Sequence, residues 1–459
     1  MEDHLFSEFS PISSKQWKQQ IQFELKGADY NDIVWESPEG IKVRPFYHGD
    51  EAAAPIEVPS HAGFKICQDI FVFDLEKSIY RAKDSVNRGA ESIRLIIEDP
   101  ETDIAKILES LPLDNITLYI QTKFLSADFI KKIDACNRTN GNVFLLADPI
   151  NQLAHDGNWF TTKAKDNFEE FNALSSSSKN ISLISVDGRL YQNAGANMIQ
   201  QAAYILAHAN EYFNKIKNID KPIVLQVAVG SNYFFEIAKL RAISMLFSLV
   251  AKEYGHEIDC HILAVPTKRN KTLYDYNVNM LRSTTECMSA ILGGADGISN
   301  LPYDAIYHKS NEFGERISRN QLLILKHESY FDKVGNPADG SFYIESLTQQ
   351  IAEKALVLFK DIEAKGGFIS QLKDGTIQRK ITESAEKEQA LFDSGKEVLL
   401  GTNKHPNKND RMSHELELFP FVKVKPRKTL ITPIIEKRLA EKMEQERLQT
   451  EKSSDSLNN

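Results

Sequence analysis

The chain has 459 residues, of which 42% are hydrophobic and 26% are charged, and its formal net charge is −9. This composition excludes a disordered or fibrous chain, and the negative balance argues against general binding of nucleic acid. No apolar run is long enough for a signal peptide or a membrane span. The four cysteines lack metal-ligand spacing, which is typical of reduced core residues. We therefore expect a cytoplasmic globular protein with neither nucleic acid nor membrane as a partner.

Residues 1–59 are predicted to form an N-terminal arm. Residues 17–25 have the pattern of a short amphipathic helix, which Gly27 ends, and residues 35–43 are typical of a turn that leads into an extended segment. The arm carries too many aromatic residues for a free tail, so it must pack either on its own chain or on a partner subunit. The aromatic residues are Phe6, Phe9, Trp17, Phe23, Trp35 and Phe46. Of these, Trp17, Phe23, Trp35 and Phe46 are the interface candidates.

From residue 60 onward, short apolar segments alternate with sequence compatible with helices. The predicted strands are 93–97, 116–121, 143–147, 181–185, 223–229 and 258–265, with 296–299 and 330–334 as weaker candidates. Eight such units over about 270 residues predict a (β/α)8 barrel, whose usual size is about 250 residues. A doubly wound open sheet is the alternative, although it normally carries fewer strands. The barrel with its closing helices is expected to span 60–404.

Bulky side chains dominate the predicted strands. Since alternate residues of a barrel strand point inward, about half of these side chains should fill the barrel axis. The bulky positions are Leu95, Ile96, Leu118, Phe144, Leu145, Leu183, Ile184, Leu225 and Ile262. Residues 405–427 form a polar, proline-punctuated connector, and a highly charged helix is predicted from 433 to about 448. We assign 405–459 to this C-terminal region.

A long helix is predicted from 234 to 254, where Gly255 ends it. It carries two apolar stripes on roughly opposite faces, so one stripe should cover the sheet and the other needs a further partner. Ile243 and Phe247 belong to the second stripe. Another helix of the same chain and a subunit interface are both open as that partner, and the two residues are therefore interface candidates.

The start of this helix, Tyr233-Phe234-Phe235-Glu236-Ile237-Ala238-Lys239-Leu240-Arg241-Ala242, resembles the signature helix of acyl-CoA mutases of the methylmalonyl-CoA mutase type. Segments 25–30, 39–45, 315–320 and 398–404 match further family motifs in the right order, which makes the resemblance specific. It covers about residues 5–449. The resemblance implies adenosylcobalamin chemistry, an N-terminal arm that wraps a partner subunit, and a catalytic barrel whose axis a CoA chain threads.

Three positions depart from the catalytic members of this family. Asp69 stands where the family motif Arg-Gln-Tyr-Ala-Gly has the tyrosine that lies over the acyl group. Leu190 replaces a histidine after the fourth strand. Leu263 replaces the histidine that donates a hydrogen bond to the thioester carbonyl, and leucine has no donor. We therefore expect no catalytic residue on this chain and a barrel axis that is filled rather than threaded by CoA.

The cobalt-binding motif of the family, Asp-x-His-x-x-Gly, has one near match at 259–264. It lacks the glycine, so His261 is predicted to be a core or strand-end histidine. The chain stops at Asn459, which leaves no room for a cobalamin domain after the charged helix. The resemblance thus implies a non-catalytic small (beta) subunit of a heterodimer, without cofactor or metal, whose large (alpha) subunit binds adenosylcobalamin.

Two rival interpretations stay open. One is a catalytic barrel subunit that uses cobalamin from a separate protein; the other is an independent barrel enzyme that has lost the mutase chemistry. Two polar features have no assigned role. The basic segment 268–271 is predicted to be a solvated loop rather than a phosphate or partner contact. Asp148 and Asp187 lie at strand ends, and without a convergent group they are interpreted as loop residues.

Overall fold

The computed structural model describes residues 8–51, 56–59, 62–136, 143–160, 164–178, 180–423 and 426–457. Phe6 therefore lies outside the described residues. Nine parallel strands form one sheet in the order β7-β6-β5-β4-β3-β11-β10-β9-β8. The strands are β3 (Lys65–Val72), β4 (Ser92–Ile97), β5 (Thr117–Thr122), β6 (Val143–Leu145), β7 (Ile181–Ser182), β8 (Ser185–Asp187), β9 (Ile223–Val229), β10 (Cys260–Pro266) and β11 (Gly297–Ser299).

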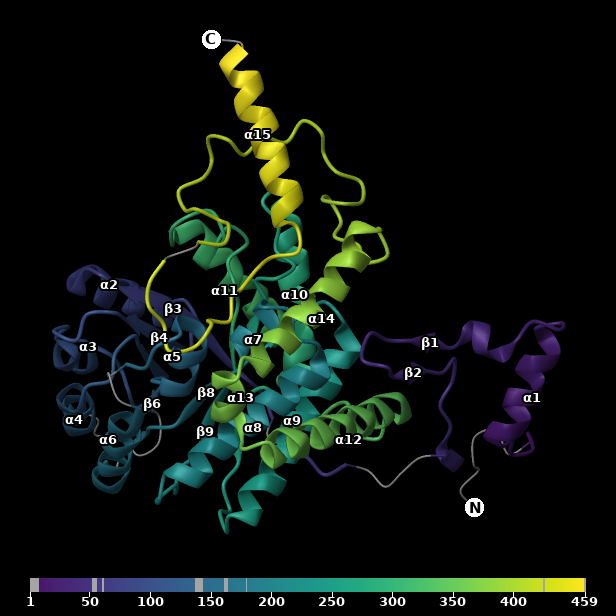
Figure 1. Ribbon diagram of the computed structural model, residues 1–459, viewed down its shortest axis with the longest axis horizontal. Helices are drawn as coiled ribbons and strands as arrows, with labels where there is room; N and C mark the ends of the chain where they lie inside the picture. The colour runs from purple at the N-terminus through teal and green to yellow at the C-terminus, as the bar shows by residue number, and fades with distance from the viewer. Residues whose placement is uncertain are drawn as a thin grey trace.

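The two ends of this sheet are halves of one barrel strand. Strand β7 pairs with β6 and strand β8 pairs with β9, while only Leu183 and Ile184 separate the two halves along the chain. The sheet therefore curls around a common axis, and helices surround it (Figure 1). The predicted α/β barrel fold is confirmed.

One strand was misplaced by the sequence pattern. The first strand is β3, and 330–334 forms turns instead of a strand. Cys67 and Asp69 point into the barrel, so β3 alternates in polarity and lacks the continuous apolar run that marks a buried parallel strand. The motif around Asp69 consequently lies within the first strand rather than before it.

Ten helices of the described chain follow or lie between the strands. They are α2 (Leu75–Asn87), α3 (Ile104–Ser110), α4 (Ala127–Cys136), α5 (Pro149–Asp156), α6 (Ala164–Ser177), α7 (Arg189–Asn193), α8 (Met198–Lys215), α9 (Tyr233–Glu253), α10 (Val278–Leu292) and α11 (Glu312–His327). The main hydrophobic core lies between these helices and the outward side chains of the strands. Seven of the nine bulky strand residues belong to this outer core; only Phe144 joins the barrel interior, and Ile96 lies at its mouth.

The barrel interior is nonetheless packed. Its cluster consists of Cys67, Tyr119, Phe144, Leu146, Val224 and Leu263, none more than 5% exposed. The Tyr119 hydroxyl lies 2.6 Å from His261 Nε2, and the Phe144 ring stacks on His261 with centroids 4.5 Å apart. Side chains therefore fill the axis at this level as predicted, and aromatic rings do so together with the branched aliphatic residues Leu146, Val224 and Leu263.

Helix α9 meets both of its apolar partners within this chain. It packs against α8, α10 and α12 (Phe342–Ala364), and Ile243 and Phe247 are fully buried. The same-chain alternative is therefore right, and the proposal of Ile243 and Phe247 as interface residues is wrong. The physical reason is α12, which follows the barrel in sequence and returns to cover the second stripe.

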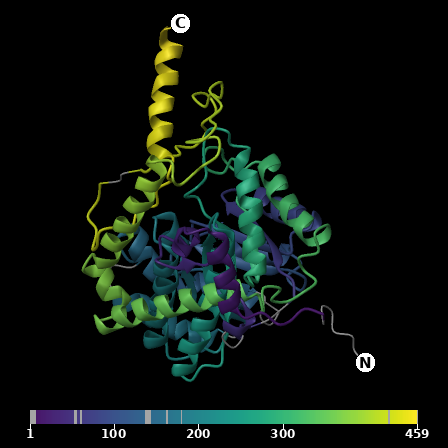
Figure 2. The ribbon, with the colours of Figure 1, turned by 90° about the vertical axis from the view of Figure 1, so that its right-hand side faces the viewer.

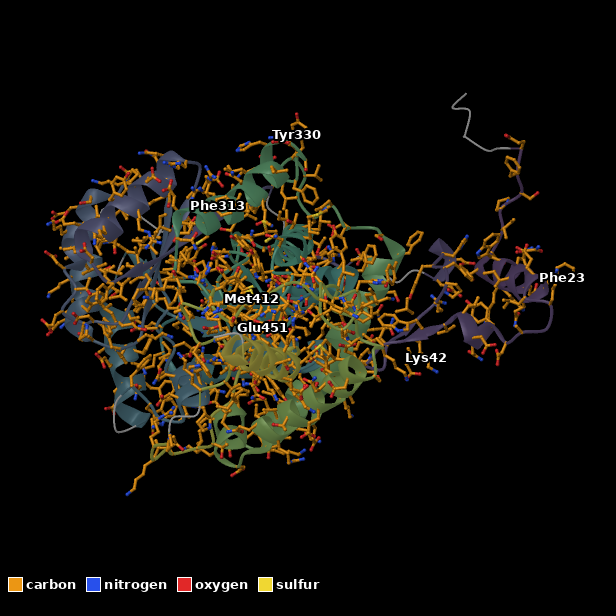
Figure 3. The ribbon with its side chains drawn as sticks, turned by 90° about the horizontal axis from the view of Figure 1, so that it is seen from above. Phe23, Lys42, Phe313, Tyr330, Met412 and Glu451 are labelled. Carbon is orange, nitrogen blue, oxygen red and sulfur yellow. The ribbon has the colours of Figure 1, made fainter. Side chains whose placement is uncertain are left out.

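The N-terminal arm is docked at one end and extended at the other. It contains α1 (Ser14–Glu24) and a hairpin of β1 (Trp35–Glu36) and β2 (Lys42–Val43). The hairpin turn buries Ile41 completely, and the Trp35 ring meets Phe235 edge-on at 5.6 Å. Helix α1 stands away from the body, with Phe23 at its far end (Figures 1 and 3).

The chain after the barrel continues through α12, α13 (Phe368–Lys373) and α14 (Thr376–Asp393) to α15 (Glu441–Leu457). The predicted charged helix thus begins at Glu441 rather than at 433, because residues 433–440 run as irregular backbone along the barrel loops. Helix α15 projects from the body (Figures 1 and 2). Within the described residues there is no second parallel sheet, and none of their helices is long and apolar enough to cross a membrane.

Candidate functional site

A cavity of about 350 Å³ opens at the carboxyl ends of the barrel strands. This is the face on which barrel enzymes carry their active sites. Charged and polar side chains from most of the strands converge on it. They include Asp69, Arg94, Gln121, Lys123, Asp148, Asp187, Arg189, Asn193, Lys268, Ser299, Asn300 and Glu436.

Asp69 and Arg94 form an ion pair at this cavity. Arg94 Nε donates to Asp69 Oδ1 at 2.9 Å, and the Ser299 hydroxyl donates to the same oxygen at 2.6 Å. The Arg94 side chain is only 4% exposed, and it also reaches Gln226 Oε1 at 3.5 Å. Strands β3, β4, β9 and β11 are thereby cross-linked across the inside of the barrel.

A second ion pair links Asp187, at the end of β8, to Arg189 in the first turn of α7. Arg189 Nε and Nη2 donate to the two carboxylate oxygens at 2.8 and 2.6 Å, so the pair is bidentate. Burial alone would raise the pKa of Asp187, but the positive charge of Arg189 and its hydrogen bonds outweigh burial and hold that pKa well below its usual value.

Asp148 is the centre of a buried hydrogen-bond network. It accepts from His208 Nε2 at 3.0 Å, from the Tyr212 hydroxyl at 2.6 Å and from the backbone N–H of Asp187 at 2.8 Å. It also caps the N-terminus of α5. The interpretation of Asp148 and Asp187 as loop residues without convergent groups is therefore wrong. Their partners come from other elements, and spacing in the sequence does not reveal such contacts.

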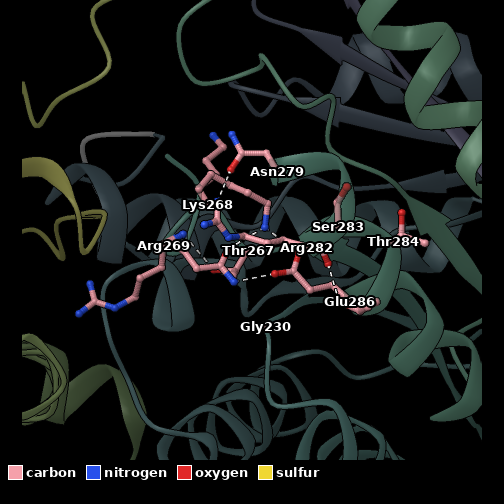
Figure 4. A network of polar contacts seen from close by, with 12 residues as sticks. Gly230, Thr267, Lys268, Arg269, Asn279, Arg282, Ser283, Thr284 and Glu286 are labelled. Atoms are coloured by element: carbon pink, nitrogen blue, oxygen red, sulfur yellow. Dashed lines mark hydrogen bonds and ion pairs between the residues drawn. The ribbon is translucent and has the colours of Figure 1, made fainter. Parts of the chain in front are cut away.

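The basic segment 268–271 is mostly buried, and Figure 4 shows the network of polar contacts around it. Arg269 Nη1 donates to the Lys437 carbonyl at 2.7 Å, and Lys271 Nζ pairs with Glu286 Oε2 at 2.7 Å. Asn270 Nδ2 donates to the other oxygen of Glu286 at 2.6 Å. Only Lys268 is exposed, so the prediction of a solvated loop is correct for this one residue. Arg269 pairs with the chain that follows the barrel, and Asn270 and Lys271 pair with the buried Glu286 on α10.

Comparison with known proteins identifies the family. The model of the methylmalonyl-CoA mutase family matches residues 99–453. The methylmalonyl-CoA mutase small subunit of Porphyromonas gingivalis is 33% identical over 450 residues, which cover 88% of this chain and 71% of that protein. The chain belongs to the methylmalonyl-CoA mutase family.

Other relatives in the methylmalonyl-CoA mutase family are longer. The mutase of Rhizobium meliloti is 26% identical over 477 residues, covering 86% of this chain and 64% of the relative. That of Cereibacter sphaeroides is 26% identical over 469 residues, covering 85% of this chain and 64% of the relative. The chain therefore spans less than two thirds of the length of these two mutases.

The three positions predicted to depart from the mutase family motifs lie at the mouth and in the interior of the barrel. Asp69 and Leu190 line the mouth cavity. Leu263 lies deeper, in the interior cluster with Tyr119, while Val265 of the same strand reaches the cavity. Leu190 and Leu263 are at most 3% exposed, and neither carries a hydrogen-bond donor.

The residues that resemble the cobalt-binding motif of the mutase family do not fit that role. His261 lies in β10, where Nε2 is engaged by the Tyr119 hydroxyl and the ring stacks on Phe144. Its Nδ1 lies 3.6 Å from Asp296 Oδ1. In the part of the chain that the structure describes, no group of three or more His, Cys, Asp or Glu side chains is arranged to hold a metal ion. His261 is a core histidine, as the sequence predicts.

Proposed function

We propose that this chain is the non-catalytic small subunit of a heterodimeric, adenosylcobalamin-dependent methylmalonyl-CoA mutase. Its large partner subunit would bind the cofactor and interconvert methylmalonyl-CoA and succinyl-CoA. The observation that carries the proposal is the filled barrel axis. Tyr119, Phe144 and His261 form one stacked and hydrogen-bonded layer where a CoA chain would have to pass. Displacing such packed side chains costs about 1–3 kcal/mol for each one that must move.

The chemistry of the cavity supports the same proposal. A thioester oxygen that gains negative charge needs hydrogen-bond donors, and removing one such donor typically costs about 100- to 1000-fold in rate. Leu263 has no donor to offer, and Leu190 also replaces a histidine. Asp69 carries a carboxylate, which would repel the developing charge if its bonds to Arg94 and Ser299 were broken.

The exposed aromatic residues of the arm support the proposal of a partner subunit. Trp17 and Phe23 on α1 are 46% and 80% exposed, and Trp35 is 50% exposed although its ring contacts Phe235 on α9. Phe46 is half-buried and packs against Trp17 within the arm, with ring centroids 6.4 Å apart. Exposed aromatic side chains on an extended helix are the kind of surface that protein interfaces bury.

Reconstitution tests this proposal. The purified chain, mixed with adenosylcobalamin and methylmalonyl-CoA, should give no succinyl-CoA and no cobalamin spectrum shifted from that of the free cofactor. Co-expression with a large subunit that carries both barrel and cobalamin domain should give turnover and co-purification. Turnover by this chain and the cofactor alone would contradict the proposal.

One observation favours a second candidate function. The polar mouth cavity is compatible with a catalytic barrel that receives cobalamin from a separate protein. Mixing the chain with an isolated cobalamin-binding protein separates the two candidates. Turnover in that mixture supports the second candidate, and its absence, together with turnover in the heterodimer, supports the first.

A further inference from the structure

Besides Arg94, which reaches the mouth cavity from within β4, three cationic side chains reach it from three different strand ends. Lys123 directly follows β5, Arg189 begins α7 after β8, and Lys268 follows β10. Arg189 is held by its bidentate pair with Asp187. The ammonium groups of Lys123 and Lys268, in contrast, have no hydrogen bond and no carboxylate within 4.0 Å in the described part of the chain. Both side chains are exposed to the solvent of the cavity.

The carboxylates that line the cavity already have partners. Asp69 is held by Arg94 and Ser299, Asp187 by Arg189, and Asp148 by His208 and Tyr212. Glu436 Oε1 accepts a hydrogen bond from Asn193 at 2.9 Å. Among the lysines and arginines of this wall, Lys123 and Lys268 are therefore the two that have no carboxylate partner in the described part of the chain and are available to a ligand.

The electrostatics of Lys123 agree with this geometry. Although the Lys123 side chain as a whole is exposed, the cavity walls partly desolvate it, and this is the largest cause that lowers its pKa. Attraction to Asp187 and Glu98 opposes this lowering, and repulsion from Arg189 and Lys268 adds to it. A negative charge bound to both lysines would offset this repulsion. Gln121 and Gln152 also line the cavity and add neutral amide donors.

We propose that the mouth cavity binds a small dianionic oxyanion, a phosphate or a dicarboxylate, through the ammonium groups of Lys123 and Lys268. Two separate cationic groups in one cavity match a ligand with two negative charges better than a ligand with one negative charge. The site requires no cobalamin, no thioester and no partner subunit, so it goes beyond the proposed function and stands or falls independently of it.

Isothermal titration calorimetry on the purified full chain, at constant ionic strength, tests this site. The probes are inorganic phosphate, malonate and, as a monoanion, acetate. We expect saturable binding of phosphate or malonate and binding of acetate at least tenfold weaker. Binding of only one dianion identifies whether the site prefers a phosphate or a dicarboxylate.

The variants Lys123→Ala and Lys268→Ala should each weaken dianion binding by about tenfold or more, because each removes a hydrogen bond between charged groups. Lys132→Ala removes the same charge from an exposed position on α4 and should bind as the unaltered chain does. Thermal unfolding of each variant verifies that it is folded. The inference is overturned if neither dianion binds saturably, or if the double variant Lys123→Ala/Lys268→Ala binds as tightly as the unaltered chain.

Discussion

At the scale of single residues, buried charges hold the loops of the barrel mouth in place. Lys271 and Glu286 are both at most 2% exposed in their side chains, and Asn270 completes the contacts of Glu286. A buried pair of this kind gains little over an apolar pair, but removing one partner leaves the other charge buried without compensation. The loop after β10 is thus fixed by an ion pair to α10.

The variant Lys271→Ala should destabilise the protein by about 3–5 kcal/mol, because it leaves Glu286 charged and buried. Urea unfolding followed by circular dichroism measures this. The neighbouring exposed residue provides the control: Lys268→Ala should change the stability by no more than about 0.5 kcal/mol. Equal effects of the two substitutions would show that the Lys271–Glu286 pair is not structurally important.

Asp187 should contribute to the pH dependence of stability. The pKa of Asp187 in the folded protein is depressed below its value of about 3.9 in the unfolded chain. Its contribution to the free energy of unfolding is therefore complete above about pH 3.9 and is lost as the pH falls further. Asp187→Asn should therefore be less stable than the unaltered chain near pH 7, and the difference should shrink on acidification to about pH 3.

Urea midpoints measured across this pH range test the prediction for Asp187. Asp361→Asn is a suitable control, since the Asp361 carboxylate is half exposed on α12 and forms a surface pair with Lys365. Its substitution should shift the stability by about 0–1 kcal/mol. A difference between Asp187→Asn and the unaltered chain that is independent of pH would contradict the prediction.

At the scale of elements, the packing of the barrel axis depends on how closely the Tyr119 side chain of β5 approaches Gly297 on β11. A Cβ atom on Gly297 would lie 2.8 Å from the Tyr119 hydroxyl and 3.3 Å from Leu263 Cδ1. Gly297 does not have a positive φ, so lack of space rather than backbone strain excludes a side chain there.

Gly297→Ala should therefore destabilise the protein by about 1–3 kcal/mol through overpacking. The double variant Gly297→Ala/Tyr119→Phe removes the hydroxyl that the new methyl group meets. In a double-mutant cycle, the double variant should lose less stability than the sum of the losses caused by the two single substitutions. Strict additivity would show that the axis has spare room at this level.

The arm gives a prediction about association. If the proposed heterodimer forms, Trp17→Ala/Phe23→Ala should weaken it by about tenfold or more, because exposed aromatic residues often dominate interface energies. The thermal stability of the isolated chain should not change. Phe313→Ala, which removes a comparably exposed ring on α11, should leave the complex intact. Unchanged affinity of the double variant would exclude α1 from the interface.

The sequence predicted the elements with continuous apolar runs and missed those without them. Strand β9 was predicted with its observed bounds, because all seven of its residues are buried and all except Gln226 are apolar. Strand β3 was missed because Cys67 and Asp69 face an interior that is partly polar. The helix expected from 433 begins only at Glu441, because residues 433–440 are hydrogen-bonded to the barrel loops instead. For example, the Leu439 N–H donates to the Arg269 carbonyl at 2.9 Å.

The candidate site was predictable only in part, for a related reason. Asp69 and Leu190 were found through family motifs, and both line the cavity. The ion pairs of Asp187 and Lys271, in contrast, depend on the three-dimensional approach of separate elements. Lys123 was not selected at all, because a single lysine after a strand has no distinguishing pattern in a sequence.

At the scale of the whole molecule, the barrel of a methylmalonyl-CoA mutase family member has its interior packed with side chains and carries an exposed arm. Tyr119, Phe144 and His261 occupy the axis, and the ion pair of Asp69 with Arg94 lines the mouth cavity. In the proposed heterodimer this chain would supply a folded scaffold and an interface, while the chemistry would take place on the partner.

The most direct measurement is the equilibrium binding of methylmalonyl-CoA to the purified chain, followed by calorimetry without any partner or cofactor. We expect no saturable binding, since the CoA chain cannot pass the layer of Tyr119, Phe144 and His261. Weak binding that phosphate displaces and Lys123→Ala/Lys268→Ala abolishes would reflect the mouth cavity alone. Saturable binding of methylmalonyl-CoA that free CoA displaces, and that persists in this double variant, would show that the barrel axis admits CoA and that this chain is not the proposed non-catalytic subunit.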